Sequence, residues 1–249
     1  FAKMQLLVPG ETAAPGTASG KTGTPTAQAA GTAFNVTVNA VDANWNLVTG
    51  APANVITITS SDGNAVLPAT NTLSSGTQTF SVELRTVGTA TVTATNTTDG
   101  TKTANTSPSI TVNVGPFAKM QLLVPGETAA PGTASGKTGS PSGQTAGSSF
   151  SVTVNAVDAA WNVVTGAPAN VITITTSDLN DTEPATNTLA SGTQTFSVTF
   201  TTAGSWTVTA TNTTDGTKTA NTSPSITTSA GAFAKMQLLV PGETAAPGT

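Results

Sequence analysis

The 249-residue chain contains no cysteine, histidine or tyrosine, and charged residues make up only 8% of it. The lack of cysteine excludes disulfides and thiolate metal sites. Without histidine, a nucleophile–base pair or a metal site loses its commonest side chain. The formal net charge is −4, whereas proteins that bind nucleic acids or anionic membranes carry clusters of Lys and Arg. We therefore expect no nucleic-acid partner and no membrane contact by this segment.

Long apolar runs are missing too. No stretch approaches the ~18 apolar residues of a membrane-spanning helix, and no signal peptide is visible. No window shows a sustained 3.6-residue apolar stripe, and the helix-favouring residues Leu, Glu and Lys are scarce. Val, Ile and Thr are abundant instead, which favours strands.

The most informative feature that is present is a long internal repeat. The stretch FAKMQLLVPGETAAPGT begins at Phe1, Phe117 and Phe233, at intervals of 116 residues. A fixed long period indicates one structural unit copied in tandem. Because the first residue is Phe rather than Met, we expect the chain to be a window on a longer array. The predicted domains are 1–116, 117–232 and, as the first strand and loop of a truncated third repeat, 233–249.

Within each repeat, apolar and polar residues alternate. Phe34, Val36 and Val38 alternate with Asn35 and Thr37, which is the period-2 pattern of half-buried strands. Glycines separate such runs at about 12-residue intervals, a spacing typical of sandwiches and barrels. An all-β, two-sheet antiparallel sandwich is the simplest way to bury one face of every strand. The strands predicted for the first repeat are 2–8, 34–41, 46–49, 54–60, 77–85, 89–96 and 108–114.

Residues 9–31 do not fit a strand, because they are rich in Gly, Ala, Thr and Pro. Loops of this length are uncommon inside compact domains and are usually functional or disordered. One interpretation is a floppy surface loop. The other is an extended segment that lies against its own sandwich, or against a neighbour, in a polyproline-like or edge-strand path.

Two differences between the repeats test the sandwich. Leu84 of the first repeat corresponds to Phe200, and Ala90 corresponds to Trp206. Both changes enlarge inward positions on neighbouring predicted strands, while Val87 nearby corresponds to the smaller Ala203. Cores tolerate exchanges that roughly conserve total volume, so we expect a compensated repacking in the second repeat.

A recognisable pattern runs through the middle of each repeat. Ala30, Gly31, Phe34, Val36, Val38, Ala40, Asp42, Asn46, Val48 and Gly50 form it, and it recurs from Ala146 to Gly166. The pattern resembles the bacterial immunoglobulin-like repeats of the invasin and intimin type, which read AG-x-x-F-x-V-T-V-x-A-x-D-x-x-G-N-x-V-x-G. The resemblance implies tandem immunoglobulin-like antiparallel β-sandwiches in a stalk on a bacterial surface. Trp45 and Trp161 replace the family's turn glycine, which calls its usual positive-φ turn into question.

Candidate metal ligands lie in this turn of the first repeat. Asp42, Asn44 and Asn46 have the spacing of the first half of a calcium loop. Leu47 stands where such a loop needs glycine, and no Glu follows at the twelfth position. A turn held by Asx side-chain hydrogen bonds is therefore the expected structure.

The second repeat carries an acidic cluster of its own. Asp178, Asn180, Asp181 and Glu183 lie close together in the sequence, and they form either a weak cation site or, as we expect, a solvated acidic turn. The segment TASGKT at 17–22 lacks the first glycine and the strand-to-helix context of a phosphate loop.

The remaining candidates are isolated side chains. Lys3, Lys21 and Lys102 fall in exposed strand or turn positions and have no base beside them. Trp45 and Trp161 would be carbohydrate-stacking platforms if both were exposed, but aromatic packing under a turn is the expected arrangement.

We therefore predict a structural protein that is not an enzyme, with no catalytic, cofactor-binding or metal residues and no cofactor. In this prediction, immunoglobulin-like domains stack head to tail in a long extracellular stalk or filament at the cell surface. The partners are neighbouring repeats of the same protein and other copies in a fibre. Two arrangements stay open: one long continuous polypeptide, or short chains polymerised by strand donation, in which a segment such as 233–249 completes a neighbour's sheet. The alternative is an adhesin or carbohydrate-binding module whose repeats contact a ligand directly. A phage tail decoration is a third interpretation.

Overall fold

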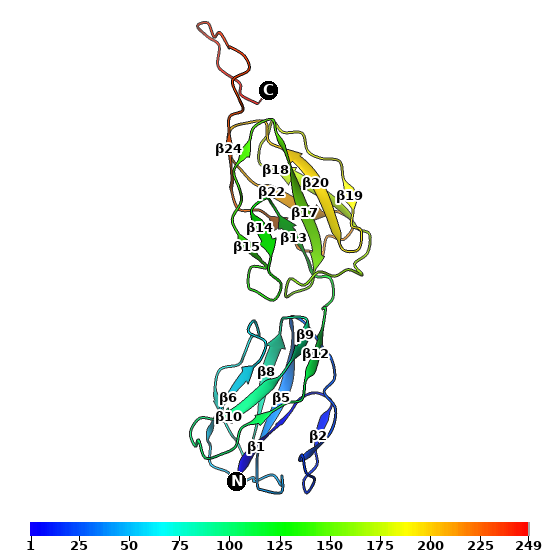
Figure 1. Ribbon diagram of the computed structural model, residues 1–249, viewed down its shortest axis with the longest axis vertical. Coiled ribbons are helices and arrows are strands. Elements are labelled where there is room, and N and C mark those ends of the chain that lie inside the picture. The colour runs from blue at the N-terminus through cyan, green and yellow to red at the C-terminus, as the bar shows by residue number, and fades with distance from the viewer. Residues whose placement is uncertain (249) are drawn as a thin grey trace. The chain divides into compact units, whose positions relative to one another are not determined.

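The computed structural model describes residues 1–248 and divides the chain into two compact units, Phe1–Gly115 and Pro116–Thr249 (Figure 1). Every regular element of the described residues is a strand, and no helix among them could cross a membrane. The strands of the first unit are β1 (Lys3–Leu7), β2 (Glu11–Ala13), β3 (Lys21–Gly23), β4 (Gln28–Ala29), β5 (Thr32–Val41), β6 (Val55–Ser60), β7 (Asn71–Thr72), β8 (Thr77–Leu84), β9 (Gly88–Ala90), β10 (Val92–Asn96), β11 (Asn105–Thr106) and β12 (Ile110–Asn113).

The second unit repeats this order of strands. They are β13 (Lys119–Leu123), β14 (Glu127–Ala129), β15 (Lys137–Gly139), β16 (Gln144–Thr145), β17 (Ser149–Val157), β18 (Val171–Thr176), β19 (Asn187–Thr188), β20 (Thr193–Thr199), β21 (Gly204–Trp206), β22 (Val208–Asn212), β23 (Asn221–Thr222) and β24 (Ile226–Ser229).

Each unit is an immunoglobulin-like sandwich. In the first unit, one layer has the strand order β1-β5-β8, and the other contains β11-β10-β6-β7 and β4-β12-β9. Since β9 and β10 follow one another in a single stretch, they join the two short sheets of the second layer. The layers correspond to strands A-B-E and C-F-G of the immunoglobulin fold. The predicted fold class, all-β with tandem immunoglobulin-like antiparallel sandwiches, is confirmed.

The core lies between the layers and follows the alternation in the sequence. Met4 and Leu6 of β1 are fully buried, as are Val36 and Val38 of β5. Their neighbours on the same strands point away from the core, so each strand contributes one apolar face. Burying a side chain of this size contributes about 1.5–3 kcal/mol. The opposite layer supplies Ile56, Ile58, Val92, Ala94, Ile110 and Val112.

The enlarged inward positions of the second unit are accommodated in its core. Phe200 is fully buried, and its ring centroid lies 5.1 Å from that of Phe150. Trp206 packs against the edge of the same core and donates a 2.7 Å hydrogen bond from Nε1 to the carbonyl of Thr202. A buried indole N–H finds a partner in this way.

Two expectations differ from the structure, and a third is decided between its alternatives. Residues 46–49 form no strand, and only Leu47 makes an isolated bridge to Val41. Of the two interpretations of residues 9–31, the structure agrees with the segment that lies against its own unit: it contains β2, β3 and β4, and β4 pairs with β12. Residues 233–248 form no strand, because the 249 residues contain no third counterpart of β5 to pair with them.

Candidate functional site

The feature that sets these units apart from a plain sandwich is the folded insert at residues 9–31, which we call the insert hairpin. Strands β2 and β3 pair antiparallel, from Glu11 opposite Gly23 to Ala13 opposite Lys21. Glu11 accepts a 3.1 Å hydrogen bond from the amide of Val8. The insert hairpin is thus fixed at its base directly after β1.

A buried ion pair holds the insert hairpin against its own unit. Lys21 Nζ lies 2.9 Å from Glu11, whose side chain is almost fully buried. The same ammonium group donates a 3.2 Å hydrogen bond to the carbonyl of Leu6 in β1. A buried carboxylate with a charge partner and further hydrogen bonds avoids the large penalty of an unpaired charge.

A chain of side-chain hydrogen bonds runs from the sheet to the insert hairpin. Thr77 Oγ1 donates to Asn39 Oδ1 at 2.9 Å, and Asn39 Nδ2 donates to Gln5 Oε1 at 2.9 Å. Gln5 Nε2 then donates to the carbonyl of Gly20 at 2.6 Å. Gln5 is 1% exposed, so the insert hairpin covers the outer face of β1. These hydrogen bonds together link β8, β5, β1 and the insert hairpin.

The turn at 42–46 is an Asx turn, as expected. Asp42 Oδ1 accepts hydrogen bonds from the amides of Asn44 and Asn46 at 2.8 and 2.9 Å, and Oδ2 accepts one from Asn46 Nδ2. The Asn46 side chain and these amides lower the pKa of Asp42. Since its own turn occupies both oxygens, Asp42 is not arranged as the start of a calcium loop.

Trp45 adopts φ of 70°, the left-handed conformation in which the related pattern carries glycine. The positive-φ turn that the tryptophan called into question is therefore present in both units, since Trp161 also has φ of 70°. This conformation costs a non-glycine residue roughly 1–2 kcal/mol, so the contacts of the indole must offset the strain.

The indole of Trp45 is partly buried and contacts two residues that are distant in the sequence. A Cβ on Gly20 would overlap the ring, so the backbone of Gly20 lies flat against it. The ammonium nitrogen of Lys3 lies 3.5 Å from the ring centroid, a cation–π geometry. Trp45 Nε1 donates to the carbonyl of Ala18 at 3.3 Å.

The same contacts recur in the second unit. Gln121 Nε2 donates to the carbonyl of Gly136 at 2.7 Å, and Trp161 Nε1 donates to that of Ala134 at 3.1 Å. Lys119 Nζ lies 3.5 Å from the ring centroid of Trp161. The set is therefore a feature of the repeat and serves the packing of each unit. Neither Trp45 nor Trp161 is a flat open platform.

Asp178 and Asp181 of the second unit accept hydrogen bonds from different donors. Asp178 Oδ2 accepts from the amides of Thr201 and Thr202 at 2.8 and 2.9 Å. Burial raises its pKa, but these hydrogen bonds outweigh burial and leave the pKa lowered. The carboxylate of Asp181 instead accepts from Thr176 Oγ1 at 2.7 Å. Across residues 1–248, no group of three or more acidic side chains is placed to hold a metal ion.

The segment 17–22 covers the end of the loop between β2 and β3 and the first two residues of β3. Thr17 Oγ1 accepts from the amide of Gly20 at 3.1 Å, and Lys21 points toward Glu11 rather than outward. Lys102 pairs with Asp99 at 3.3 Å. The expectation that Lys21 is exposed is wrong, because its side chain is only 12% exposed in the ion pair with Glu11.

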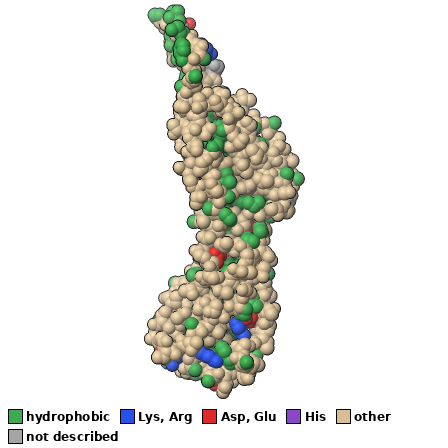
Figure 2. Space-filling model, in the orientation of Figure 1, with side chains coloured by type: hydrophobic (Ala, Val, Ile, Leu, Met, Phe, Trp, Pro, Cys, Tyr) green, Lys and Arg blue, Asp and Glu red, His purple; other side chains and the backbone are tan. Residues whose placement is uncertain are grey.

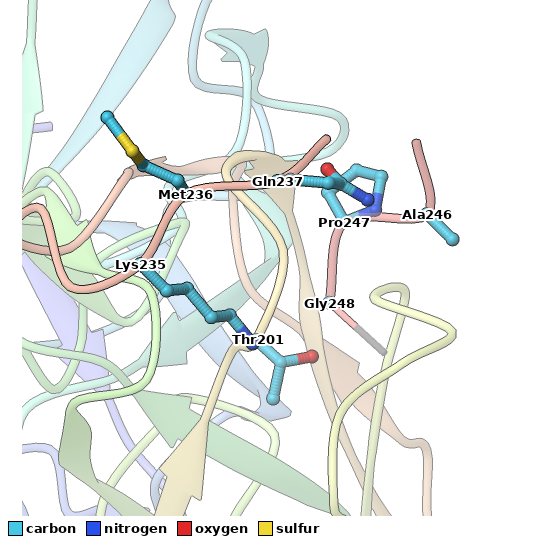
Figure 3. Close-up of a pocket in the computed structure, with 7 residues that line it drawn as sticks. All are labelled: Thr201, Lys235, Met236, Gln237, Ala246, Pro247 and Gly248. Atoms are coloured by element: carbon cyan, nitrogen blue, oxygen red, sulfur yellow. The ribbon is translucent and has the colours of Figure 1, made fainter. Parts of the chain in front are cut away.

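One open pocket lies in the second unit, between Thr201 and the segment that follows β24 (Figure 3). Lys235 reaches toward Thr201 in this view, while Met236 points away. Figure 2 shows hydrophobic side chains gathered at this end of the chain, and few charged ones elsewhere on the visible face. The segment has no strand partner, and its exposed apolar residues are Phe233, Met236, Leu238, Leu239 and Val240.

Sequence reasoning missed Gln5, Glu11 and Gly20 as members of this arrangement. The usable signal was Gln5, a long polar side chain in an apolar strand that begins the repeat. Glu11 and Lys21 carry opposite charges in a segment that is otherwise nearly uncharged. Their equivalents Glu127 and Lys137 form the same pair at 3.0 Å.

No protein-family model and no curated protein match the chain. Among solved structures it is similar to the D0–D1 domain of intimin, with 17% identity, 83% of this chain and 95% of that chain covered, and a TM-score of 0.31. It is also similar to FdeC, an adhesin of Escherichia coli, with 13% identity, 92% and 64% covered, and a TM-score of 0.34. Invasin, described as a bacterial integrin-binding protein, shows 21% identity, 91% and 39% covered, and a TM-score of 0.36.

This likeness concerns the fold alone, which the strand order of each unit already defines. The chain spans less than two thirds of the FdeC and invasin structures.

Proposed function

We propose that this chain is a structural, non-catalytic part of a bacterial extracellular protein. In this proposal its immunoglobulin-like units stack head to tail in a long stalk or filament at the cell surface. Neighbouring repeats of the same protein are the partners, together with other copies where stalks form fibres.

One observation carries the proposal: the side chains around the insert hairpin bind their own unit, and their counterparts make the same contacts in the second unit. Gln5, Lys21 and Trp45 each contact the insert hairpin or hold it to β1. Side chains committed to internal packing support a role in building the unit. Repetition of the whole set supports an array, in which stability adds up over units and interfaces.

Small-angle X-ray scattering of the 249-residue chain tests the stacking. A head-to-tail array has a maximum dimension close to the summed lengths of its two units. The curve should then fit an elongated particle at several salt concentrations. A maximum dimension close to that of one unit would contradict the stacking.

Location needs a separate test on cells of the source organism. An antibody against this chain should label intact cells, and added protease should remove the label without lysing them. Labelling that requires permeabilised cells would overturn the extracellular part of the proposal.

A glycan array separates the structural role from the carbohydrate-binding alternative. That alternative requires an accessible indole face, whereas Lys3 and Gly20 cover the ring of Trp45. We expect no glycan binding by the intact chain. Binding that Trp45→Ala and Trp161→Ala abolish together would favour the alternative.

A further inference from the structure

The first strand of each unit is hydrogen-bonded along both of its edges. In β1, the partner on one edge is β5, paired antiparallel from Lys3 opposite Val41 to Leu7 opposite Thr37. On the other edge, the amide of Met4 donates to the carbonyl of Thr103 at 2.9 Å. Strand β1 therefore bridges the two layers of the sandwich.

On the second edge of β1, one hydrogen-bond acceptor is a side chain. The amide of Leu6 donates a 2.9 Å hydrogen bond to Asn105 Oδ1. The bridge between Lys3 and Thr103 is parallel, so β1 and the segment at 103–105 run in the same direction. The counterparts in the second unit are Leu122 and Asn221, joined at 3.0 Å.

Direction decides how such a pair responds to tension. The chain reaches the first unit through β1 and leaves it after β12, at opposite ends of the unit (Figure 1). Pulling on those two ends slides β1 and the segment at 103–105 past each other. Hydrogen bonds in a parallel pair are slanted but evenly spaced along the strands, so sliding loads them together, whereas a hairpin pulled from its open end separates one bond at a time.

The insert hairpin adds a third attachment to β1. Gln5 Nε2 is bonded to the carbonyl of Gly20, and Lys21 Nζ is bonded to the carbonyl of Leu6. Both attachments hold the strand from its outer face, where a plain sandwich would leave it exposed to water.

We propose that β1 is a mechanical clamp, in which its shear pairing with Thr103 and Asn105, secured by the insert hairpin, sets the force at which each unit unfolds. The same clamp in the second unit consists of β13, Thr219 and Asn221. The inference rests on the proposed stalk function, since only a tethered chain carries tension. The clamp itself is a property of the purified chain and is tested on it.

Single-molecule force spectroscopy of the whole chain provides the test. Cysteines added before Phe1 and after Thr249 are the only attachment sites, because the chain has none of its own. Asn105→Ala removes the acceptor of the Leu6 amide in the first unit and leaves Asn221 intact in the second. We expect one unfolding event at constant force to become roughly ten- to a hundred-fold faster, as a lost buried hydrogen bond predicts. The other event serves as an internal reference.

Two further variants separate the clamp from simple loss of stability. Asn105→Asp keeps an acceptor oxygen for Leu6 and should restore the rate of the original chain at neutral pH. Thr106→Ala removes an exposed hydroxyl that contacts Thr93 but not β1, and should leave the rate unchanged. Because shear depends on direction, Asn105→Ala should accelerate unfolding by force more than unfolding by urea.

The inference is overturned if Asn105→Ala leaves both events unchanged, or if force and urea accelerate the variant equally. It is also overturned if Asn105→Asp behaves like Asn105→Ala. Any of these results leaves the stalk untouched, since scattering and cell labelling test the stalk independently.

Discussion

Gly20 lies against the face of the Trp45 indole so closely that any side chain at position 20 would overlap the ring. The two residues come from different parts of the unit, the loop of the insert hairpin and the turn after β5. Gly20 has φ of 74° and Trp45 has φ of 70°, so both backbones are left-handed at the contact. Two conformations that are unfavourable for most residues are combined here to bring the insert hairpin onto the sheet.

Gly20→Ala should destabilise the first unit by about 2–4 kcal/mol, because it adds backbone strain and an overlap with the ring. Peptide-resolved hydrogen exchange under urea measures the change, and the second unit, with Gly136 intact, is the reference. Equal protection of both units would contradict the tight contact.

A second substitution, Trp45→Gly, tests whether the ring causes this effect, because it restores the glycine of the related pattern and removes the ring. In that background, Gly20→Ala should cost only about 1 kcal/mol, the strain of the left-handed backbone alone. The double-mutant cycle therefore predicts strong coupling between the two positions. Additive effects would show that the ring is not what excludes the side chain.

Thr228→Val should stabilise the second unit by about 1–3 kcal/mol, since it removes a buried hydroxyl without a partner. Thr228 is 3% exposed, and its Oγ1 makes no hydrogen bond within residues 1–248. The first unit carries Val112 at this position, so Val112→Thr is the reverse control and should destabilise it. Thermal unfolding of the two variants is the measurement, and a shift of both in the same direction would refute the explanation.

Asp62 should make the first unit sensitive to acid. Burial raises its pKa, but the amides of Thr86 and Arg85 and the Thr86 hydroxyl outweigh burial, so the pKa lies below its ordinary value of 3.8. A carboxyl whose pKa is lowered by folding stabilises the fold above about pH 4 and loses this effect as the pH falls through the folded-state pKa. Asp62→Asn should therefore destabilise the unit at pH 7 by about 1–3 kcal/mol, with a smaller difference below pH 4. Urea titrations at both pH values compare the two proteins; a difference independent of pH would count against the carboxylate.

Asp181 should have the opposite effect on the second unit, which it makes less stable as the pH rises. Burial raises its pKa first of all, repulsion from Glu183 and Asp178 adds to this, and the Thr176 hydrogen bond opposes it. Its contribution to stability is present below its ordinary pKa and is lost as the pH rises through the raised value. Asp181→Asn keeps an acceptor for Thr176 and should stabilise the second unit at pH 7 by up to about 1 kcal/mol, an amount limited by solvent screening. The gain should vanish near pH 3, whereas a gain retained there would point to packing instead of charge.

The strands were predictable from the sequence where apolar and polar residues alternate, because this alternation decides which side chains of a strand are buried. Phe34, Val36 and Val38 lie on one face of β5 because side chains of a strand point alternately to its two faces. That relation is local, so it can be read without a structure. The Asx turn at Asp42 was predictable for the same reason, since its hydrogen bonds span only a few residues.

The candidate site was less predictable because its contacts join distant segments. Trp45 keeps a left-handed backbone only because Gly20 and Lys3 support the ring, and neither lies near it in the sequence. Residues 9–31 read as a loop from composition, yet the Glu11–Lys21 pair and Gln5 give them a fixed place.

The chain itself separates what sequence decides from what tertiary structure decides. The same 17 residues begin at positions 1, 117 and 233, so their alternation and strand propensity are identical. They form β1 and β13, where Leu6 and Leu122 are fully buried, but no strand at the third position, where Leu238 is 85% exposed. Alternation determined which face of the segment is apolar. The presence of a neighbouring strand decided whether it folds, because a strand's backbone groups and its apolar face are satisfied only by other segments of the chain.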